Sequence, residues 1–238
     1  MAQIKPFAIV TGASRGIGKA VAKYFAEQGY DLALIARDPK RLENTVTELL
    51  QLTAGNIQIK PYAIDIANHK AVTITMNSII EAQPSIDILF NNAGILLPGT
   101  TALSVDDFNH MLQVNLLGAF AVAKPVAEQM QRQGFGYIFN LASNGGKRAL
   151  PNVGGYCATK FGLVGLNEAL QKELATNHVK VTALCPSVTD TDMTQDFTII
   201  NEEKIQTEDI VKTVAYLLSL NKNTHVPEII IKCRTITN

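Results

Sequence analysis

Thr11-Gly12-Ala13-Ser14-Arg15-Gly16-Ile17-Gly18 joins a short apolar run, Phe7–Val10, to Gly16–Gln28, where apolar residues recur at helical spacing. Glycines let a backbone turn tightly and approach a pyrophosphate, and a helix N-terminus presents free N–H groups to such an anion. A glycine-rich turn without a ligand is the alternative. The order strand, glycine turn, helix favours a dinucleotide-binding loop, with candidate contacts Gly12, Ser14, Arg15, Gly16, Ile17 and Gly18.

Outward from this loop, strand and helix patterns alternate to the end of the chain. The expected strands are Phe7–Val10, Leu32–Ala36, Ile57–Ile64, Ile86–Phe90, Gly136–Leu141, Val179–Leu184 and Glu228–Lys232. The expected helices are Gly16–Gln28, Pro39–Leu52, one between the third and fourth strands, Leu103–Gln133, Gly154–Thr176 and Thr207–Leu220. We expect Gly29 to cap the first helix and Pro125 to interrupt or kink the long one.

Repeated strand–helix units of this length predict an α/β fold, a doubly wound parallel sheet of about seven strands with helices on both faces. The 238 residues fit one domain, and no linker or composition shift indicates a second. Residues 1–238 are therefore expected to form a single Rossmann-type domain.

Composition excludes several function classes. Acidic and basic residues balance at 21 each, so no basic surface for nucleic acid or an anionic membrane is expected. There is no signal peptide pattern and no membrane-length apolar run. Cys157, Cys185 and Cys233 are widely spaced, which indicates reduced thiols in a cytoplasmic protein. For Cys157, a small buried side chain is favoured over a redox role.

The glycine spacing resembles the Thr-Gly-x-x-x-Gly-x-Gly signature of the short-chain dehydrogenase/reductase family, and the resemblance runs through nearly the whole chain. It implies a nicotinamide cofactor and interconversion of carbonyl and alcohol, with no metal site. Within the family the chain resembles the 3-oxoacyl-[acyl-carrier-protein] reductases in part. Those proteins close with a glycine-rich stretch, whereas this chain ends in Pro227–Arg234.

The end of the second strand indicates which dinucleotide is bound. An acid there would bond the ribose hydroxyls of NAD, but the family's spacing puts Ala36 at that position, with Arg37 next to it. Arg37 and Arg15 could hold a 2′-phosphate through charge-assisted hydrogen bonds, which predicts NADP(H). A solvated surface charge is the alternative for Arg37, and Asp38 is expected to form a turn or helix cap before Pro39.

Two further segments match the family's cofactor cleft. In Ala63-Ile64-Asp65-Ile66, the resemblance implies that Asp65 lies against the adenine, with Ile66 beside it. In Asn91-Asn92-Ala93-Gly94, it implies that Asn92, Ala93 and Gly94 lie along the cofactor. The alternatives are that Asp65 caps the following helix and that the second segment is a plain turn.

Tyr156 and Lys160 are four residues apart near the start of a predicted helix, so they share one face. A free tyrosine, with a pKa of about 10, is a poor base at neutral pH, and a nearby ammonium group lowers that pKa. Such pairs are common on helix surfaces. Ser143, at the carboxyl end of the fifth strand, strengthens the interpretation, since its hydroxyl could hydrogen-bond a substrate oxygen. Lys160 is also expected to bond the nicotinamide ribose.

Asn115 matches the fourth catalytic position of the family, where the implied role is to hold a water in a proton relay through Lys160. Asparagine is otherwise unfavourable inside a helix. The alternative is an exposed position without a function.

The loop after the sixth strand departs from the family. The usual Pro-Gly is Pro186-Ser187 here, so we expect a different local backbone path. Pro186, Thr189 and Thr191 remain in register with residues that border the nicotinamide and its phosphates. Residues from about 192 to 205 are the expected substrate lid, short and moderately polar.

The leading hypothesis is an NADP(H)-dependent reductase of ketones, with 3-oxoacyl thioesters among the candidate substrates. An NADP-dependent dehydrogenase of a sugar, polyol or steroid-type alcohol is the second, and a non-catalytic dinucleotide-sensing protein is the third. The resemblance also implies a homotetramer formed through the helices at Leu103–Gln133 and Gly154–Thr176.

Overall fold

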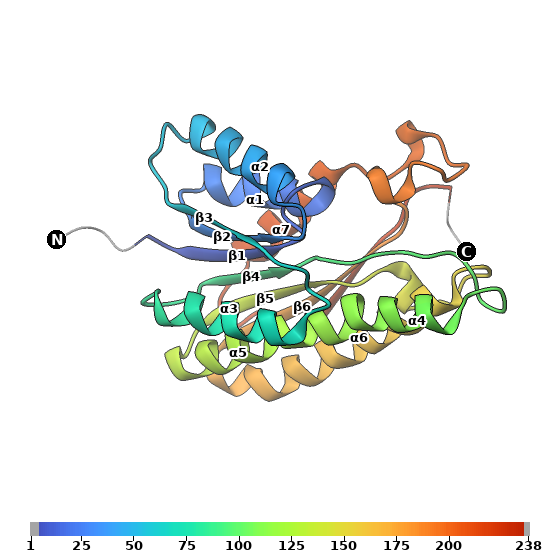
Figure 1. Cartoon of the computed structure of the whole chain (residues 1–238). Coiled ribbons are helices and arrows are strands. Elements are labelled where there is room, and N and C mark those ends of the chain that lie inside the picture. Colours follow the sequence, from blue (N-terminus) through green and yellow to red (C-terminus); the bar gives the residue numbers. More distant parts are fainter. Residues whose placement is uncertain (1–4, 236–238) are drawn as a thin grey trace.

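A seven-stranded parallel sheet forms the centre of the computed structural model, which describes residues 5–235 (Figure 1). Its strand order is β3-β2-β1-β4-β5-β6-β7. The predicted fold class is therefore confirmed. The strands are β1 (Phe7–Thr11), β2 (Asp31–Ala36), β3 (Ile59–Ala63), β4 (Ile88–Asn91), β5 (Gly136–Leu141), β6 (Val179–Pro186) and β7 (Glu228–Ile231).

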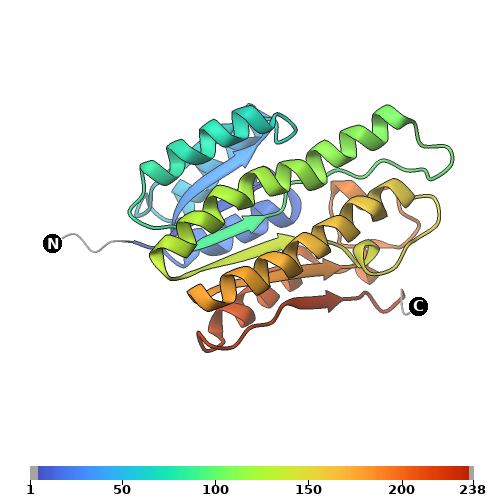
Figure 2. The same ribbon diagram turned by 90° about the horizontal axis from the view of Figure 1, so that it is seen from below.

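Helices cover both faces of the sheet. In Figure 1, α1, α2 and α7 lie above it and the other helices below it, and Figure 2 shows the lower layer side by side. The bounds are α1 (Gly16–Glu27), α2 (Pro39–Leu52), α3 (His69–Glu81), α4 (Val105–Leu112), α5 (Ala119–Gln133), α6 (Gly154–Leu174) and α7 (Thr207–Ser219). No helix within residues 5–235 is both long and apolar enough to cross a bilayer.

Two apolar cores, one on each face, hold the layers together. All five residues of β1 are buried, and they alternate in direction, as side chains of a strand must. Ala8 and Val10 belong to the core under α1, α2 and α7, whereas Phe7 and Ile9 belong to the core over α3 and α5. This two-sided burial explains why the strands are continuous apolar runs.

The long helical region differs from its prediction. Ser104 caps its start by accepting from the Asp107 amide, so α4 begins at Val105. The interruption is a π-helical turn, η1 (Gln113–Gly118), and Pro125 lies within α5. Close packing accompanies the turn, because a Cβ on Gly118 would lie 2.6 Å from the Ile66 carbonyl oxygen.

Other strand ends differ from their predicted positions by a few residues, because a strand ends where its pairing with the neighbouring strand ends. Ile57 lies before the paired part of β3, and β6 continues to Pro186, which pairs with Ile231 of β7. The first helix ends as expected: Gly29 follows it with a φ of +81°. Asp38 caps α2, accepting from the Arg41 amide at 3.1 Å.

The strand order locates the ligand-binding edge. The chain runs outward from β1 to β3, then returns to place β4 on the other side of β1. At this reversal the connections leave β1 and β4 in opposite directions, which opens a crevice at the carboxyl ends of the strands. The glycine loop and Asn91–Gly94 both begin there.

Phe139→Ala should lower the free energy of unfolding by about 3–5 kcal/mol, because it empties a fully buried site. The Phe139 ring stacks on that of Tyr137, with centroids 4.0 Å apart. Urea unfolding at one fixed protein concentration measures the loss. Phe135→Ala is the control, since Phe135 is 44% exposed, and it should cost about 1 kcal/mol or less. Equal losses for the two variants would contradict this packing.

Candidate active site

A cleft of about 1030 Å³ lies at the carboxyl edge of the sheet. Ligand sites for small molecules commonly span about 300–1,000 Å³, so this one has room for an extended ligand. Of the predicted site residues, only Gly18 and Asn115 do not line it. Those that do are Gly12, Ser14, Arg15, Gly16, Ile17, Arg37, Asp65, Ile66, Asn92, Ala93, Gly94, Ser143, Tyr156, Lys160, Pro186, Thr189 and Thr191.

The glycine loop needs its glycines for two different reasons. Gly12 and Gly16 have φ values of +65° and +53°, which side chains rarely adopt. Gly18 serves packing instead, because a Cβ there would lie 2.3 Å from the Gly12 carbonyl oxygen. Arg15 occupies the N-cap of α1 without a side-chain capping bond. The amides of the first helical turn are thus directed at the cleft and suited to an anion.

Hydrogen bonds hold the glycine loop against the segment after β4. The Thr11 hydroxyl oxygen accepts from the backbone amides of Asn92 and Ala93, at 2.8 and 3.0 Å. The Asn92 side chain donates in return to the Thr11 carbonyl oxygen at 2.9 Å. Asn91–Gly94 is therefore more than a plain turn, because it fixes the loop on the opposite wall of the crevice.

Charged side chains gather where β2 leaves the sheet. Arg37 is exposed and lines the cleft. Arg15 donates to the Asp192 carboxylate at 2.8 Å, and a nitrogen of Arg41 lies 3.7 Å from the same oxygen. The hydrogen bond from Arg15 holds the pKa of Asp192 below its ordinary value. Sequence reasoning missed Arg41 and Asp192. Arg41 could have been found, because it lies in the first turn of the helix that follows Arg37.

Asp65 lines the cleft but does not cap the next helix. Its carboxylate accepts from the Ala67 amide at 3.0 Å, forming a local turn. Asn68 caps α3 instead, accepting from the Ala71 amide. The capping alternative for Asp65 is therefore wrong.

Ser143, Tyr156 and Lys160 converge at the floor of the cleft. A Cβ built on Gly145 would lie 3.4 Å from Ser143 Oγ and 3.5 Å from Tyr156 Cε1. The Ser143 hydroxyl accepts from the Gly145 amide at 3.0 Å, which fixes its direction. Lys160 Nζ lies 5.7 Å from the centroid of the Tyr156 ring and donates to the Leu141 carbonyl oxygen at 2.8 Å.

Asn115 is fully buried within the π-helical turn, so the exposed-position alternative is wrong. Its side-chain oxygen accepts from the Ile95 amide and its side-chain nitrogen donates to the Ile95 carbonyl oxygen, both at 2.8 Å. The same nitrogen donates to Thr159 Oγ1 at 3.1 Å. The amide group thus secures the wall beside Gly94. A relay through Lys160 remains a prediction.

Burial shifts the pKa values of Tyr156 and Lys160, the two titratable groups at the floor of the cleft. It raises the pKa of Tyr156 to about 12, although the hydrogen bond with Ser143 acts in the opposite direction. The pKa of Lys160 falls to about 8 because burial disfavours its charge. We expected the lysine to lower the pKa of the tyrosine. In the chain without ligands, desolvation of the phenolate outweighs any such effect.

Ser187 gives the loop after β6 a bond that glycine could not make. Its hydroxyl accepts from the Cys233 amide, and its own amide donates to the Ile231 carbonyl oxygen, both at 2.8 Å. These bonds attach the loop to the segment after β7, and a backbone path different from that of the family remains a prediction. Two residues on, Thr189 is buried at the cleft, and its hydroxyl has no hydrogen-bond partner within the described chain.

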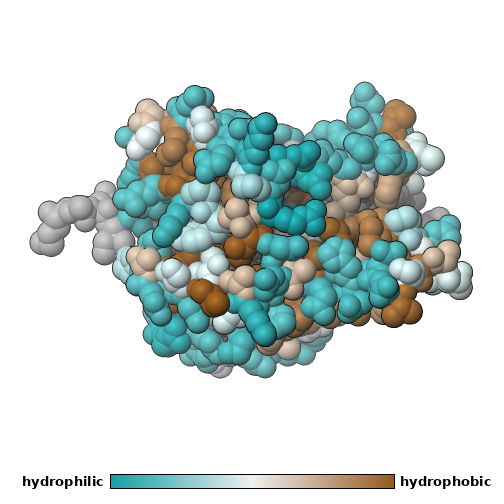
Figure 3. Space-filling view, viewed as in Figure 1, coloured by the Kyte–Doolittle hydropathy of each residue, from teal (hydrophilic) through white to brown (hydrophobic). Residues whose placement is uncertain are grey.

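The lid, residues 192–205, contains two short 3₁₀ turns. The buried ammonium group of Lys204 supports it from inside, donating to the Thr194 carbonyl oxygen at 2.8 Å and to Asn201 Oδ1 at 2.9 Å. Met193, Phe197 and Ile199 line the cleft. Figure 3 shows apolar surface in the hollow between the lid side and the lower layer. Cys157, Cys185 and Cys233 are buried, and no disulfide joins them within residues 5–235.

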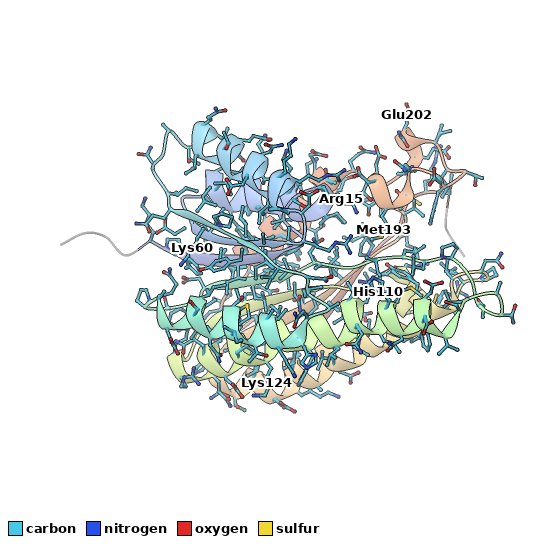
Figure 4. The ribbon with its side chains drawn as sticks, in the orientation of Figure 1. Arg15, Lys60, His110, Lys124, Met193 and Glu202 are labelled. Carbon is cyan, nitrogen blue, oxygen red and sulfur yellow. The ribbon has the colours of Figure 1, made fainter. Side chains whose placement is uncertain are left out.

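Lys160→Met should remove the contribution of Lys160 to the pH dependence of the free energy of unfolding. The pKa of Lys160 is about 8 in the fold against 10.5 ordinarily, so between these values the unfolded chain binds the extra proton. The free energy of unfolding of the wild type should therefore rise with pH, relative to Lys160→Met, by about 3 kcal/mol across this window. Denaturant unfolding at several pH values measures the difference. Lys124→Met, on the exposed outer side of α5 (Figure 4), should show no such trend. A constant gap between wild type and Lys160→Met would contradict the burial of a titrating lysine.

Known sequences match this chain over most of its length. A family model described as short chain dehydrogenase matches residues 6–200. An uncharacterized oxidoreductase of Staphylococcus epidermidis is 32% identical over 234 residues, covering 98% of this chain and 99% of its own length.

Solved structures share the whole fold. A betaketoacyl-[ACP] reductase from Bacteroides thetaiotaomicron superposes with a TM-score of 0.86 at 33% identity, with 98% of each chain covered. An alcohol dehydrogenase from the archaeon Thermococcus sibiricus, complexed with 5-hydroxy-NADP, gives a TM-score of 0.87 at 31% identity, with 96% of each chain covered. An actinorhodin polyketide ketoreductase with NADPH gives 0.85 at 27% identity, with 98% of each chain covered.

Proposed function

The chain belongs to the short-chain dehydrogenase/reductase family, and we propose that within it this protein is an NADP(H)-dependent reductase of apolar ketones. The observation that carries the proposal is the convergence of Ser143, Tyr156 and Lys160 on one floor of the cleft. An idle dinucleotide-binding protein would not require these three groups together.

The cleft fits a dinucleotide on two observations. Gly12 and Gly16 line the cleft in left-handed backbone conformations, so this part of its wall is backbone without side chains, as close approach to a pyrophosphate requires. At the other end, the buried Thr189 hydroxyl has no partner within residues 5–235 and lines the cleft, as expected for a group that awaits a polar ligand atom. The residues that would hold the cofactor are those predicted from the sequence, with the nicotinamide near Thr189 and Tyr156.

Preference for the phosphorylated cofactor follows from charge. Ala36 ends β2 without an acid, while Arg15 and Arg37 line the adjacent part of the cleft. Guanidinium groups bind phosphate through paired, charge-assisted hydrogen bonds. The NADP and NADPH named with two of the structural neighbours support the same cofactor.

When bound, NADPH would supply the hydride that reduces the carbonyl carbon. Ser143 would orient the substrate oxygen by hydrogen bonding, and the Tyr156 hydroxyl would donate the proton that completes the alcohol. Since its pKa is about 8, Lys160 is mostly charged at neutral pH. Its ammonium group would stabilise the phenolate that remains after proton donation.

The substrate end favours an apolar ketone over a sugar or polyol. Leu96, Leu150, Met193, Phe197 and Ile199 line the cleft together with the polar Asn144, Asn152 and Asp196, and we propose that the apolar group surrounds the substrate. A sugar would leave hydroxyls without partners against these side chains. Ketones with alkyl or aryl groups, and the acyl chain of 3-oxoacyl thioesters, would bury apolar surface there.

Tyr156→Phe should keep NADPH affinity and lose at least about 100-fold in ketone reduction, the usual lower range for removing a general acid. NADPH oxidation against a panel of ketones, aldehydes and 3-oxoacyl thioesters measures the rate, and nicotinamide fluorescence measures binding. Tyr216→Phe, at an exposed position on α7, is the matched control. Wild-type turnover by Tyr156→Phe would sink the mechanism. A wild type that binds NADPH and reduces nothing would favour the sensor hypothesis.

An apolar surface on the lower layer supports assembly of several copies. Leu117 and Phe120 are 38% and 41% exposed. They border a shallow groove, which is lined by Leu112, Gln113, Leu116, Leu117, Phe120 and Leu166. The groove lies on the end of α4, η1, α5 and α6, within the two helical regions predicted to form the tetramer.

Light scattering of the wild type should therefore give the mass of four chains. Phe120→Glu, which places a charge in the groove, should shift the mass toward smaller species, because a buried unpaired charge is costly. Val105→Glu is the control, since Val105 is 83% exposed at the start of α4, outside the groove. A monomeric wild type would refute the assembly.

A further inference from the structure

Three charged side chains from distant parts of the chain meet at the mouth of the cleft. Arg15 comes from the glycine loop, Arg41 from the first turn of α2, and Asp192 from the start of the lid. In Figure 4, Arg15 lies at the side of the cleft facing the lid, close to Met193. The lid is thus tied by charge to the cofactor end of the site.

One oxygen of Asp192 receives both guanidinium groups. Oδ2 lies 2.8 Å from Nη1 of Arg15 and 3.7 Å from Nη1 of Arg41. Two guanidinium groups around one anionic oxygen is also the arrangement that binds a phosphate oxygen. Arg37 lines the same part of the cleft. The carboxylate therefore occupies a position suited to an external anion.

The lid backbone is held at this point, whereas the carboxylate can move. Thr191 packs on the glycine loop, since a Cβ on Gly16 would lie 3.2 Å from Thr191 Cγ2. Thr194 is held by its own hydroxyl, which donates to the Thr189 carbonyl oxygen at 2.6 Å, and by Lys204. The Asp192 side chain itself is 55% exposed. A rotation of that side chain would release Arg15 without moving the lid, and it would leave Arg41 paired only with Asp38, 3.5 Å away.

We propose that Asp192 is an internal counter-ion that competes with the 2′-phosphate of NADP(H) for Arg15 and Arg41. This makes Arg41 a third residue that determines cofactor specificity, beside Arg15 and Arg37. The inference rests on the proposed function, because it presumes that the cleft takes a 2′-phosphate. In this arrangement the Asp192 carboxylate weakens binding of the 2′-phosphate until its side chain is displaced.

The expected effects are modest for Asp192 and larger for Arg41. Ion pairs between exposed groups are weak, so Asp192→Asn should tighten binding of adenosine 2′-monophosphate and NADPH by about two- to fivefold. Arg41→Gln removes a charged phosphate ligand and should weaken both by about tenfold. NADH, which lacks the 2′-phosphate, should bind almost unchanged in both variants.

The experiment is calorimetric titration of the full chain with NADPH, NADH and adenosine 2′-monophosphate. It compares the wild type, Asp192→Asn, Arg41→Gln and the double variant. Glu202→Gln is the matched control: it removes one negative charge from the same lid, at a side chain that points away from the cleft (Figure 4). In the double variant, the gain from Asp192→Asn should shrink, because one of the two arginines that it releases is absent.

The outcomes separate this inference from the proposed function. A wild type that binds NADPH no more tightly than NADH contradicts the proposed cofactor. If the wild type prefers NADPH, an Asp192→Asn that matches Glu202→Gln overturns the counter-ion. Equal tightening of NADPH and NADH would place Asp192 at the pyrophosphate and also overturns it. Weaker binding by Asp192→Asn would mean that the ion pair closes over the bound cofactor, the opposite of competition.

Discussion

The hydrogen bonds between Thr11 and the segment after β4 are the constraint on which the site depends. The hydroxyl oxygen of Thr11 accepts from two consecutive amides, while the Asn92 side chain returns a bond to the Thr11 carbonyl. They join the two strands between which the sheet reverses its order. They continue the pairing of β1 with β4 past the strand ends, and so fix the glycine loop against the segment that includes Gly94.

A chain of buried side-chain amides extends this constraint to α6, which carries Tyr156 and Lys160. Asn91 donates to the Asn140 side chain, Asn140 donates to Asn167 on α6, and Asn167 donates to the Pro227 carbonyl oxygen. Lys160, two turns before Asn167 on the same helix, donates to the end of β5. Because buried polar groups must be paired, the network sets the position of α6 against the sheet. Because Tyr156 lies on α6, the network also sets the position of Tyr156.

Burial then sets the protonation of the groups at the floor of the cleft, and residues 192–205 form part of its wall. Desolvation holds Tyr156 protonated in the free chain, which suits donation of a proton to a substrate oxygen. In residues 192–205, Met193, Phe197 and Ile199 line the cleft, and the Asp192 carboxylate pairs with Arg15. The cleft thus combines apolar side chains from residues 192–205 with guanidinium groups near the end of β2.

The sequence by itself determined the alternation of strands and helices, the glycine loop and the spacing of Ser143, Tyr156 and Lys160, because these depend on neighbours along the chain. Only the tertiary structure decided the π-helical turn around Asn115, the direction in which the pKa of Tyr156 moves, and the meeting of Arg15 with Asp192. Those two residues are 177 positions apart. No local period or spacing encodes such a contact, since it follows from how the lid packs on the glycine loop.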